Sequence, residues 1–389
     1  MSRRRGWCPS LHAPMSAGDG LLLRVNAPSG RFEADELGIL SRLAARYGNG
    51  MIELTSRARL QFRGFDDAGA AAFAAGVVEA GLASPDPVAE RLRGAVVSPL
   101  AGLDPDCAPL ATDLATELAA GIDAVAGTLA ALPPKFGVVI DGGGAMALRG
   151  VAATVALRHR CGAWGVELGL LRAEVEAGRL VDAALSVMRA LADARSDPMR
   201  SAGLSAVPVA RTDAAAPVPA PVGPLPFGAF GLGAPTGALD ADTLLAVATA
   251  ARHGGSRQVR LTPWRSFVVP GWMPATGQAT GALVTDPADP RLRVACCIGA
   301  PRCTAGSTPT VADAATLAAI LPPATTLHVS GCGKGCARRE PATLTLVGRE
   351  GRYDAVWNGT ARDAAPDTRL PAARGLDLRA AAMLLEEAA

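Results

Sequence analysis

The amino-acid sequence predicts an α+β fold made of a duplicated unit, with the two copies related by a pseudo-twofold axis. Three observations carry this prediction: an internal repeat, one amphipathic helix in each copy, and a longer α/β-type stretch after each copy. The chain has 389 residues, enough for about two to four domains. With 49% hydrophobic residues, 19% charged residues and a net charge of +2, it is neither a disordered chain nor a basic nucleic-acid-binding protein.

The internal repeat joins residues 21–65 to residues 228–272, with an offset that stays near 207. The turn APSG at 27–30 matches APTG at 234–237. Each copy reads as a short strand, a Pro/Gly turn, an amphipathic helix, a glycine and a second strand. Copies this short bury little surface alone, so we expect them to pair side by side.

The first predicted helix follows the turn and ends at Gly48, where a C-cap is expected. Asp35 and Glu36 stand at its N-terminus, where the helix dipole favours negative charge. Its apolar positions recur at three- and four-residue spacing and are Leu37, Leu40, Leu43, Ala44 and Tyr47. Flanking strands are predicted around Val25 and over 51–54.

The stretches 90–206 and 290–389 predict two α/β domains, because strand-like runs such as 136–140 and 326–329 lie between Ala-rich helices. Residues 207–226 are rich in proline and alanine and predict a semi-rigid linker. No apolar run approaches the ~20 residues of a membrane span, and no apolar segment follows the basic first residues. We therefore expect a cytoplasmic protein without membrane or nucleic-acid partners.

Five of the eight cysteines crowd between residues 296 and 336, which indicates a metal site in a reducing compartment. Cys297 and Cys303 form a C-x5-C pair, and Cys332 and Cys336 form a C-x3-C pair. Four thiolates suit a [4Fe–4S] cluster. Zinc is the rival, although its cysteine pairs usually have two to four intervening residues. Cys296 would give x6 spacing, and we assign it as a buried thiol.

Several segments together resemble one known superfamily, the sirohaem nitrite and sulfite reductases, and within it the precorrin-3B synthase family most closely. The resemblance covers nearly the whole chain, and its most specific element is the cysteine spacing. The matching segments are GWCPSLH at 6–12, LTSRARLQFRG at 54–64, SPLAG at 98–102, LPPKF at 132–136, LTPWR at 261–265 and both cysteine loops.

The resemblance implies two ferredoxin-like halves that form one domain, together with two α/β domains. On this frame the halves are 1–85 and 227–285, and the α/β domains are 90–206 and 290–389, the latter carrying the cysteines. In the reductases, arginines and a lysine pair surround the tetrapyrrole. Arg24, Arg57, Arg93 and Lys135 stand at matching positions, but Gly137 replaces the second lysine, which argues against reduction of a small oxyanion.

The precorrin-3B synthase family implies an O2-dependent monooxygenase. It converts precorrin-3A to precorrin-3B by meso-carbon hydroxylation and γ-lactone formation, in aerobic cobalamin biosynthesis. The resemblance implies a [4Fe–4S] cluster, a mononuclear non-haem iron, and an external electron donor, such as NADH acting through a reductase or ferredoxin. Two alternatives stay open: a sirohaem-dependent nitrite or sulfite reductase, and a protein that only binds a tetrapyrrole.

Precorrin carries carboxylates around its rim, and arginine binds carboxylates in a bidentate manner. Alternation along one strand would place Arg57, Arg59 and Arg63 on the same face, together with Thr55 and Gln61. The expected substrate-binding residues are Arg24, Thr55, Arg57, Arg59, Gln61, Arg63, Arg93, Lys135 and Arg265.

The ligands of the second iron and the catalytic residues are not evident from the sequence. A two-His, one-carboxylate set is the usual non-haem arrangement. The chain offers only His12, His159, His253 and His328, and each is more readily explained as a structural histidine. Asp141 is a weak candidate for a carboxylate ligand or proton donor.

Overall fold

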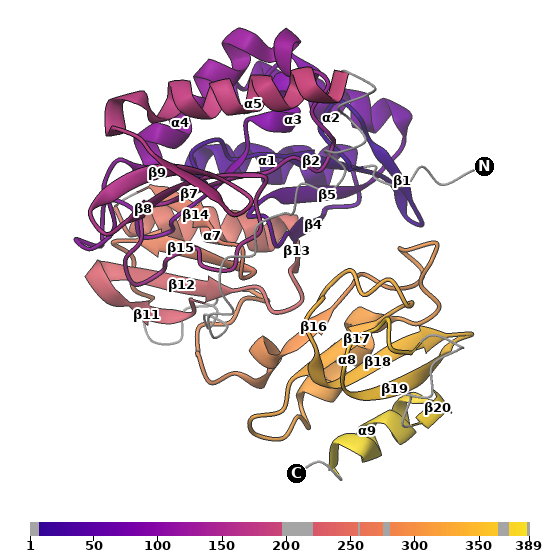
Figure 1. Cartoon of the computed structure of the whole chain (residues 1–389). Helices are drawn as coiled ribbons and strands as arrows, with labels where there is room; N and C mark the ends of the chain where they lie inside the picture. Colours follow the sequence, from indigo (N-terminus) through magenta and orange to yellow (C-terminus); the bar gives the residue numbers. More distant parts are fainter. Residues whose placement is uncertain (1–7, 197–220, 256, 275–280, 365–372, 387–389) are drawn as a thin grey trace.

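The computed structural model describes residues 8–196, 221–255, 257–274, 281–364 and 373–386. In these ranges the strands form four five-stranded sheets (Figure 1). Two sheets belong to the duplicated unit, and the other two each form the core of an α/β domain. No helix among the described residues is both long and apolar enough to cross a membrane.

The two sheets of the duplicated unit exchange one strand with each other. The first has the order β1 (Met15–Ala17), β2 (Gly20–Val25), β5 (Leu60–Phe65), β4 (Met51–Leu54), β13 (Ala238–Asp240). The second has the order β11 (Gly223–Leu225), β12 (Ala229–Gly233), β15 (Ser266–Pro270), β14 (Gln258–Leu261), β3 (Arg31–Glu33). Strand β3 thus completes the sheet of the second copy, and β13 completes that of the first, an exchange that obeys the pseudo-twofold but was not predicted from the sequence.

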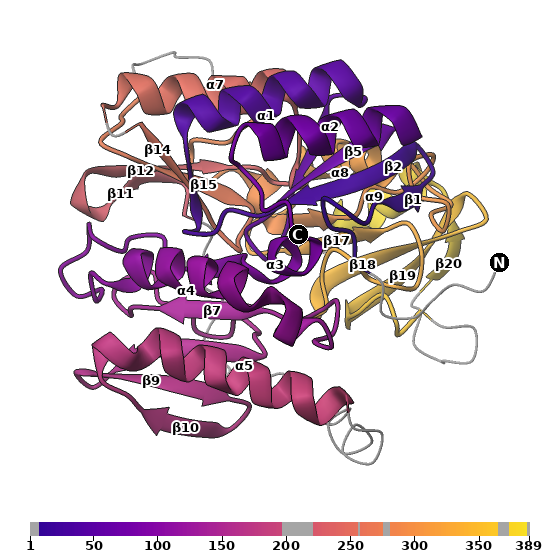
Figure 2. The ribbon, with the colours of Figure 1, turned by 90° about the horizontal axis from the view of Figure 1, so that it is seen from above.

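Helices α1 (Ala34–Tyr47) and α7 (Ala241–His253) are the equivalent helices of the two copies, and they pack against each other. Figure 2 shows them side by side, with α2 (Asp67–Glu79) next to α1. Helix α1 begins with a capping box between Glu33 and Glu36 and ends at Gly48, as the sequence predicts. Its leucines at 37 and 40 are fully buried in the central core.

The first α/β domain is a sheet covered on one face by helices (Figure 2). Its first three strands are parallel, and β8, β9 and β10 are antiparallel. The strands are β6 (Ala95–Val97), β7 (Val138–Asp141), β8 (Val155–Arg160), β9 (Ala163–Leu168) and β10 (Leu171–Glu174). The helices are α3 (Pro87–Leu92), α4 (Ala111–Val125) and α5 (Leu180–Ser196).

The C-terminal α/β domain carries the cysteine loops and appears in orange and yellow in Figure 1. The first cysteine pair follows strand β16, and the second follows β17. Because these neighbouring strands are parallel, both pairs lie at the same edge of the sheet. The strands are β16 (Val294–Cys296), β17 (Leu327–Ser330), β18 (Ala342–Arg349), β19 (Arg352–Gly359) and β20 (Ala373–Leu376). The helices are α8 (Thr310–Ala318) and α9 (Leu378–Glu386).

The predicted linker over 207–226 is only partly a linker. Residues 207–220 lie outside the described part of the chain, whereas 223–225 form strand β11 and pair with β12. Proline is tolerated here because β11 lies at the edge of the sheet and pairs with β12 alone. The N–H group that Pro224 lacks is therefore not needed to bond a strand on the other side.

Candidate functional site

The first sheet has one apolar face and one polar face. Alternation along β2, β4 and β5 sends the apolar side chains into the core beneath α1 and α2. The opposite face carries a row of paired polar residues, since Arg24 lies opposite Gln61 and Gln61 lies opposite Glu53. Arg24 Nη2 donates to Gln61 Oε1 at 2.9 Å, and Gln61 Nε2 donates to Glu53 Oε2 at 2.6 Å.

The prediction that Arg57, Arg59 and Arg63 alternate along a single strand is wrong. Strand β5 begins at Leu60, and residues 55–59 form a tight turn in which Ala58 has a φ of 51°. The Thr55 hydroxyl accepts the backbone N–H groups of Arg57 and Arg59, so it shapes the turn. The turn was not predicted from the sequence because its residue with left-handed backbone geometry is an alanine, Ala58, and not a glycine.

The turn nevertheless brings cationic side chains together. Arg24, Arg57 and Arg59 are close enough that each of the other two lowers the pKa of Arg59, after the main effect of burial, to about 9. None of the three forms an ion pair with a described carboxylate. Their positive charge is therefore available for an anionic ligand.

Cys8 lies in the same cluster, which was not predicted from the sequence. Its side chain hydrogen-bonds Arg24 and influences Arg57 and Arg59. The signal that could have found it is its position within the GWCPSLH segment, although nothing in that segment specifies contact with residues at 24 or 57.

Gly137 creates the space in which Arg57 lies. A Cβ added at Gly137 would stand 3.2 Å from Arg57 Nη1, tighter than most contacts of this kind. The same guanidinium donates to the backbone oxygen of Lys135 at 3.1 Å. The residue that replaces the reductases' second lysine thus makes room for an arginine from another domain. Lys135 itself is exposed, and its side chain forms no hydrogen bond or ion pair with a described residue.

Arg59 and Arg93 line the boundary between the first sheet and the first α/β domain. Arg59 Nη2 donates to the backbone oxygen of Gly94 at 3.0 Å. Arg93 lies 3.8 Å from the buried carboxylate of Glu90. Burial raises the pKa of Glu90, which is fully enclosed.

Arg63 faces the polar side of the sheet, but its charge is already used within the protein. It forms two hydrogen bonds with Asp19, at 2.8 and 3.0 Å, and one with Glu53 at 2.9 Å. Its Nη2 also donates to the backbone oxygen of Arg302, in the first cysteine loop, at 3.0 Å. The structure therefore makes Arg63 a link between the sheet and that loop, in contrast to the predicted substrate contact.

The four expected cluster cysteines lie in two neighbouring loops. Burial raises the pKa of Cys336, and repulsion from Cys297, Cys332 and Cys303 raises it further. The two loops also bond directly, because Ser307 N donates to Gly331 O at 3.0 Å. The backbone N–H of Gly331 donates to Cys297 Sγ at 3.2 Å.

The neighbours Cys296 and Cys297 point in different directions. Cys296 ends strand β16 and is buried in the domain core, where burial raises its pKa to about 12. Cys297 begins the loop and points to the backbone of Gly331. This is the arrangement that the assignment of Cys297 requires.

Arg265 reaches the second cysteine loop from the second copy. Its Nη2 donates to Ala337 O, next to Cys336, at 2.9 Å. It also lines an open pocket of about 110 Å³ with Arg338 and Trp264. On the other side of the loop, Arg339 is near enough to lower the pKa of Arg57, after burial. Cations from both copies thus surround the second cysteine loop.

No described group of three or more His, Cys, Asp or Glu side chains is placed to hold a metal ion. His12 is hydrogen-bonded to Ser84 O, and the ring of His159 contacts that of Trp164 in a tilted arrangement. His328 is fully buried, and burial lowers its pKa to about 4, with Arg338 and Arg265 contributing.

Asp141 is bonded to Arg158 at 2.6 Å in a buried ion pair, which gives it a structural role. The described residues therefore do not fit the mononuclear iron that the resemblance implies. Its ligand set does not form among them.

Comparison with known proteins places this geometry in a family. Residues 13–80 match the model of the nitrite/sulfite reductase ferredoxin-like half domain. The structure of the Mycobacterium tuberculosis NirA protein has a TM-score of 0.64 at 20% identity, over 90% of this chain and 76% of that one, and it shares the fold. A Sinorhizobium protein named precorrin-3B synthase is 33% identical over 92% of this chain and 84% of its own length. The duplicated α+β architecture of the nitrite and sulfite reductases is thus confirmed, and the chain belongs to the precorrin-3B synthase family.

Proposed function

We propose that this chain converts precorrin-3A to precorrin-3B with O2. One oxygen atom enters the macrocycle as hydroxylation and γ-lactone formation proceed, and the other leaves as water. Two electrons and two protons come from an external donor, such as NADH acting through a reductase or ferredoxin. The observation that carries the proposal is the cluster of Arg24, Arg57 and Arg59 without ion-pair partners, in a chain of this family.

The arginine cluster suits the chemistry of the substrate. Precorrin-3A has acetate and propionate groups around its rim, and a guanidinium binds such a carboxylate through two parallel hydrogen bonds. Arg24 is aligned by Gln61, and Arg57 by the backbone of Lys135. Glu53 in turn holds Gln61 and is itself held by Arg63. This chain of bonds fixes the cations before the substrate arrives, which reduces the entropy lost on binding.

The four loop cysteines fit a [4Fe–4S] cluster better than zinc. Zinc–sulfur bonds of about 2.3 Å would draw four thiolates within about 4 Å of one another around one ion. Zinc-binding cysteine pairs usually have two to four intervening residues, and the five residues between Cys297 and Cys303 lie outside that range. An amide N–H already points to Cys297 Sγ, as is common around cluster sulfurs. The residues that would hold the cluster are Cys297, Cys303, Cys332 and Cys336.

When bound, the cluster would supply electrons one at a time at the edge of the arginine site. The protein's own contribution is to hold the substrate carboxylates beside that edge. Arg265 and Arg339 flank the second cysteine loop and oppose its negative charge. Because thiolates in the two loops would repel one another, these cations favour their ionised form.

The first test is an anaerobic purification, followed by a visible spectrum and by counts of iron and acid-labile sulfide. We expect a broad cluster absorption without the sharp bands of sirohaem. Sharp sirohaem bands would overturn the proposal and favour a nitrite or sulfite reductase. Tight precorrin binding without O2 uptake would indicate a tetrapyrrole-binding protein.

The cysteine assignment has a matched control in the neighbouring thiol. Cys303→Ala and Cys332→Ala should each abolish the cluster, whereas Cys296→Ala should leave the iron and sulfide contents unchanged. Loss of the cluster in Cys296→Ala would refute the choice of Cys297.

The arginine site is tested by substrate binding. Arg57→Ala should weaken precorrin-3A binding by about tenfold or more, since a charge-assisted hydrogen bond contributes about 1.5–3 kcal/mol. The control is Arg252→Ala, which removes an exposed arginine already paired with Asp35. Equal binding by the two variants would show that Arg57 does not contact the substrate.

A further inference from the structure

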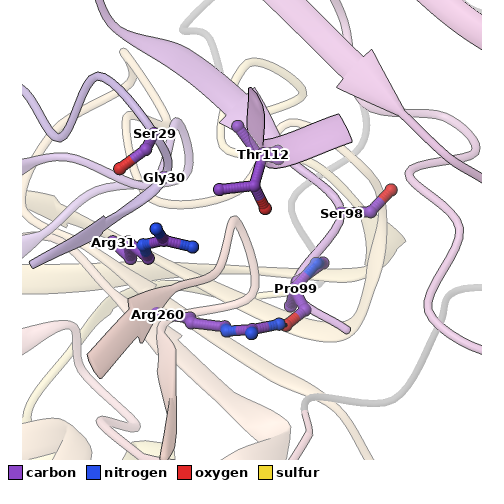
Figure 3. Close-up of a pocket in the computed structure, with 8 residues that line it drawn as sticks. Ser29, Gly30, Arg31, Ser98, Pro99, Thr112 and Arg260 are labelled. Atoms are coloured by element: carbon purple, nitrogen blue, oxygen red, sulfur yellow. The ribbon is translucent and has the colours of Figure 1, made fainter. Parts of the chain in front are cut away.

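A second basic site lies at the sheet of the second copy, where strands β3 and β14 meet the first α/β domain. It is a pocket with about 200 Å³ of empty space that opens to solvent. Figure 3 shows Arg31, Arg260 and Thr112 around this space, with Ser29 at its edge. The two arginines lie opposite each other in the β3–β14 pairing. None of these residues takes part in the arginine cluster around Cys8.

Arg260 is the most informative of these residues. Its side chain is only 8% exposed, although no described carboxylate forms an ion pair with it or with Arg31. Its Nη1 donates to Pro99 O and Ala101 O, each at 2.8 Å, whereas its Nε is buried without a partner. Burial, and to a lesser extent the positive charge of Arg31, lower its pKa to about 10. A buried cation with a second cation beside it is stabilised by a bound anion.

Helix α4 adds a third source of positive potential. Thr112 is its second residue, and the N-cap residue Leu110 provides no side-chain cap. The first amides of a helix have no intrahelical acceptor and carry the positive end of its dipole. The Thr112 hydroxyl lies on the pocket wall beside these amides (Figure 3).

We propose that this pocket binds a phosphate group. The donors approach from different directions: Arg31 from β3, Arg260 from β14, and Thr112 from the start of α4. A tetrahedral oxyanion can accept from all three, whereas a planar carboxylate presents its oxygens to one side only. The pocket is shallow and opens to solvent, so we expect the phosphate group to bind at its mouth.

The position of the site gives it a structural consequence. Strand β3 belongs to the first copy, β14 to the second, and α4 to the first α/β domain. A bound phosphate therefore joins three parts of the fold. The site has no counterpart in the other copy, because the residue equivalent to Arg260 in the repeat is Glu53.

The test is a calorimetric titration of the intact, cluster-loaded protein with inorganic phosphate, with chloride matched for ionic strength. We expect saturable one-to-one binding and a rise in Tm with phosphate concentration. Arg31→Gln and Thr112→Val should each weaken binding, the former by about tenfold or more. Arg260→Gln is a poor probe, because Arg260 also holds the 99–101 turn.

Arg57→Ala is the matched control, because it removes a cation from the substrate site and should leave phosphate binding unchanged. Titration with AMP and with adenosine identifies the source of the group: AMP binding more tightly than phosphate assigns it to a nucleotide, and equal or weaker binding assigns it to free phosphate. The proposal is overturned if no saturable binding occurs, or if Arg57→Ala abolishes binding while Arg31→Gln retains it. Neither result bears on precorrin conversion, which uses the other site.

Discussion

Replacing Arg63 by methionine should lower the free energy of unfolding by more than the loss of an exposed arginine would. The Arg63 side chain is 3% exposed, and it pairs with Asp19 and Glu53, which are 11% and 22% exposed. Methionine keeps much of the side-chain volume but leaves two carboxylates without a cation. Breaking a buried ion pair in this way costs about 3–5 kcal/mol. Because both carboxylates retain some solvent, we expect about 3 kcal/mol.

The assay is equilibrium urea unfolding followed by circular dichroism, with Arg252→Ala as the matched control. Arg252 pairs with Asp35 at 3.0 Å, but both side chains are exposed, so its loss should cost about 0–1 kcal/mol. Adding Asp19→Asn and Glu53→Gln to Arg63→Met should recover part of the lost stability, since it removes the orphaned charges. Equal losses for Arg63→Met and Arg252→Ala, or no recovery in the triple variant, would refute the reasoning.

Two further predictions follow from individual residues. His328 has a folded-state pKa of about 4 against 6.5 unfolded, so the unfolded chain binds the proton first and stability falls as pH drops from about 6.5 to 4, by about 3 kcal/mol in all. His328→Asn should flatten this part of a pH–stability profile, and an unchanged slope would exclude His328 as the cause. Gly137→Ala should displace the Arg57 guanidinium and weaken precorrin-3A binding, whereas Gly178→Ala, which meets nothing within 4 Å, should not. Identical dissociation constants for the two variants would show that Gly137 is not needed for that space.

The duplicated fold could be predicted because its evidence is local and occurs twice. A helix with leucines at 37 and 40, capped by Gly48, has the same pattern wherever it packs. The exchange of β3 and β13 between the sheets could not be predicted, since three-residue strands carry no signal of their partner. The exchange depends on how the copies associate, which is a tertiary property.

The candidate site was predictable by residue type but not by role. Arginines at 24, 57 and 59 do gather, yet a left-handed alanine, not strand alternation, brings them together. Arg63 was indistinguishable from them in sequence because its partners, Asp19 and Glu53, are 44 and 10 residues away. Burial and pairing decide whether a charge is available to a ligand, and neither can be read from spacing.

The two copies differ in the residues that occupy equivalent cross-strand positions, and only the first copy carries the arginine site proposed for precorrin. In the first sheet the cross-strand row is Arg24, Gln61 and Glu53; in the second, the equivalent row is Gly231, Val268 and Arg260. Val268 packs in an apolar cluster with Leu100 and Met146 of the first α/β domain, so the second face is covered by protein. The same row therefore carries polar side chains in one copy and packs against the first α/β domain in the other. Arg260 and its cross-strand neighbour Arg31 keep positive charges on the second face, at the edge of that packing, where the proposed phosphate would compensate them.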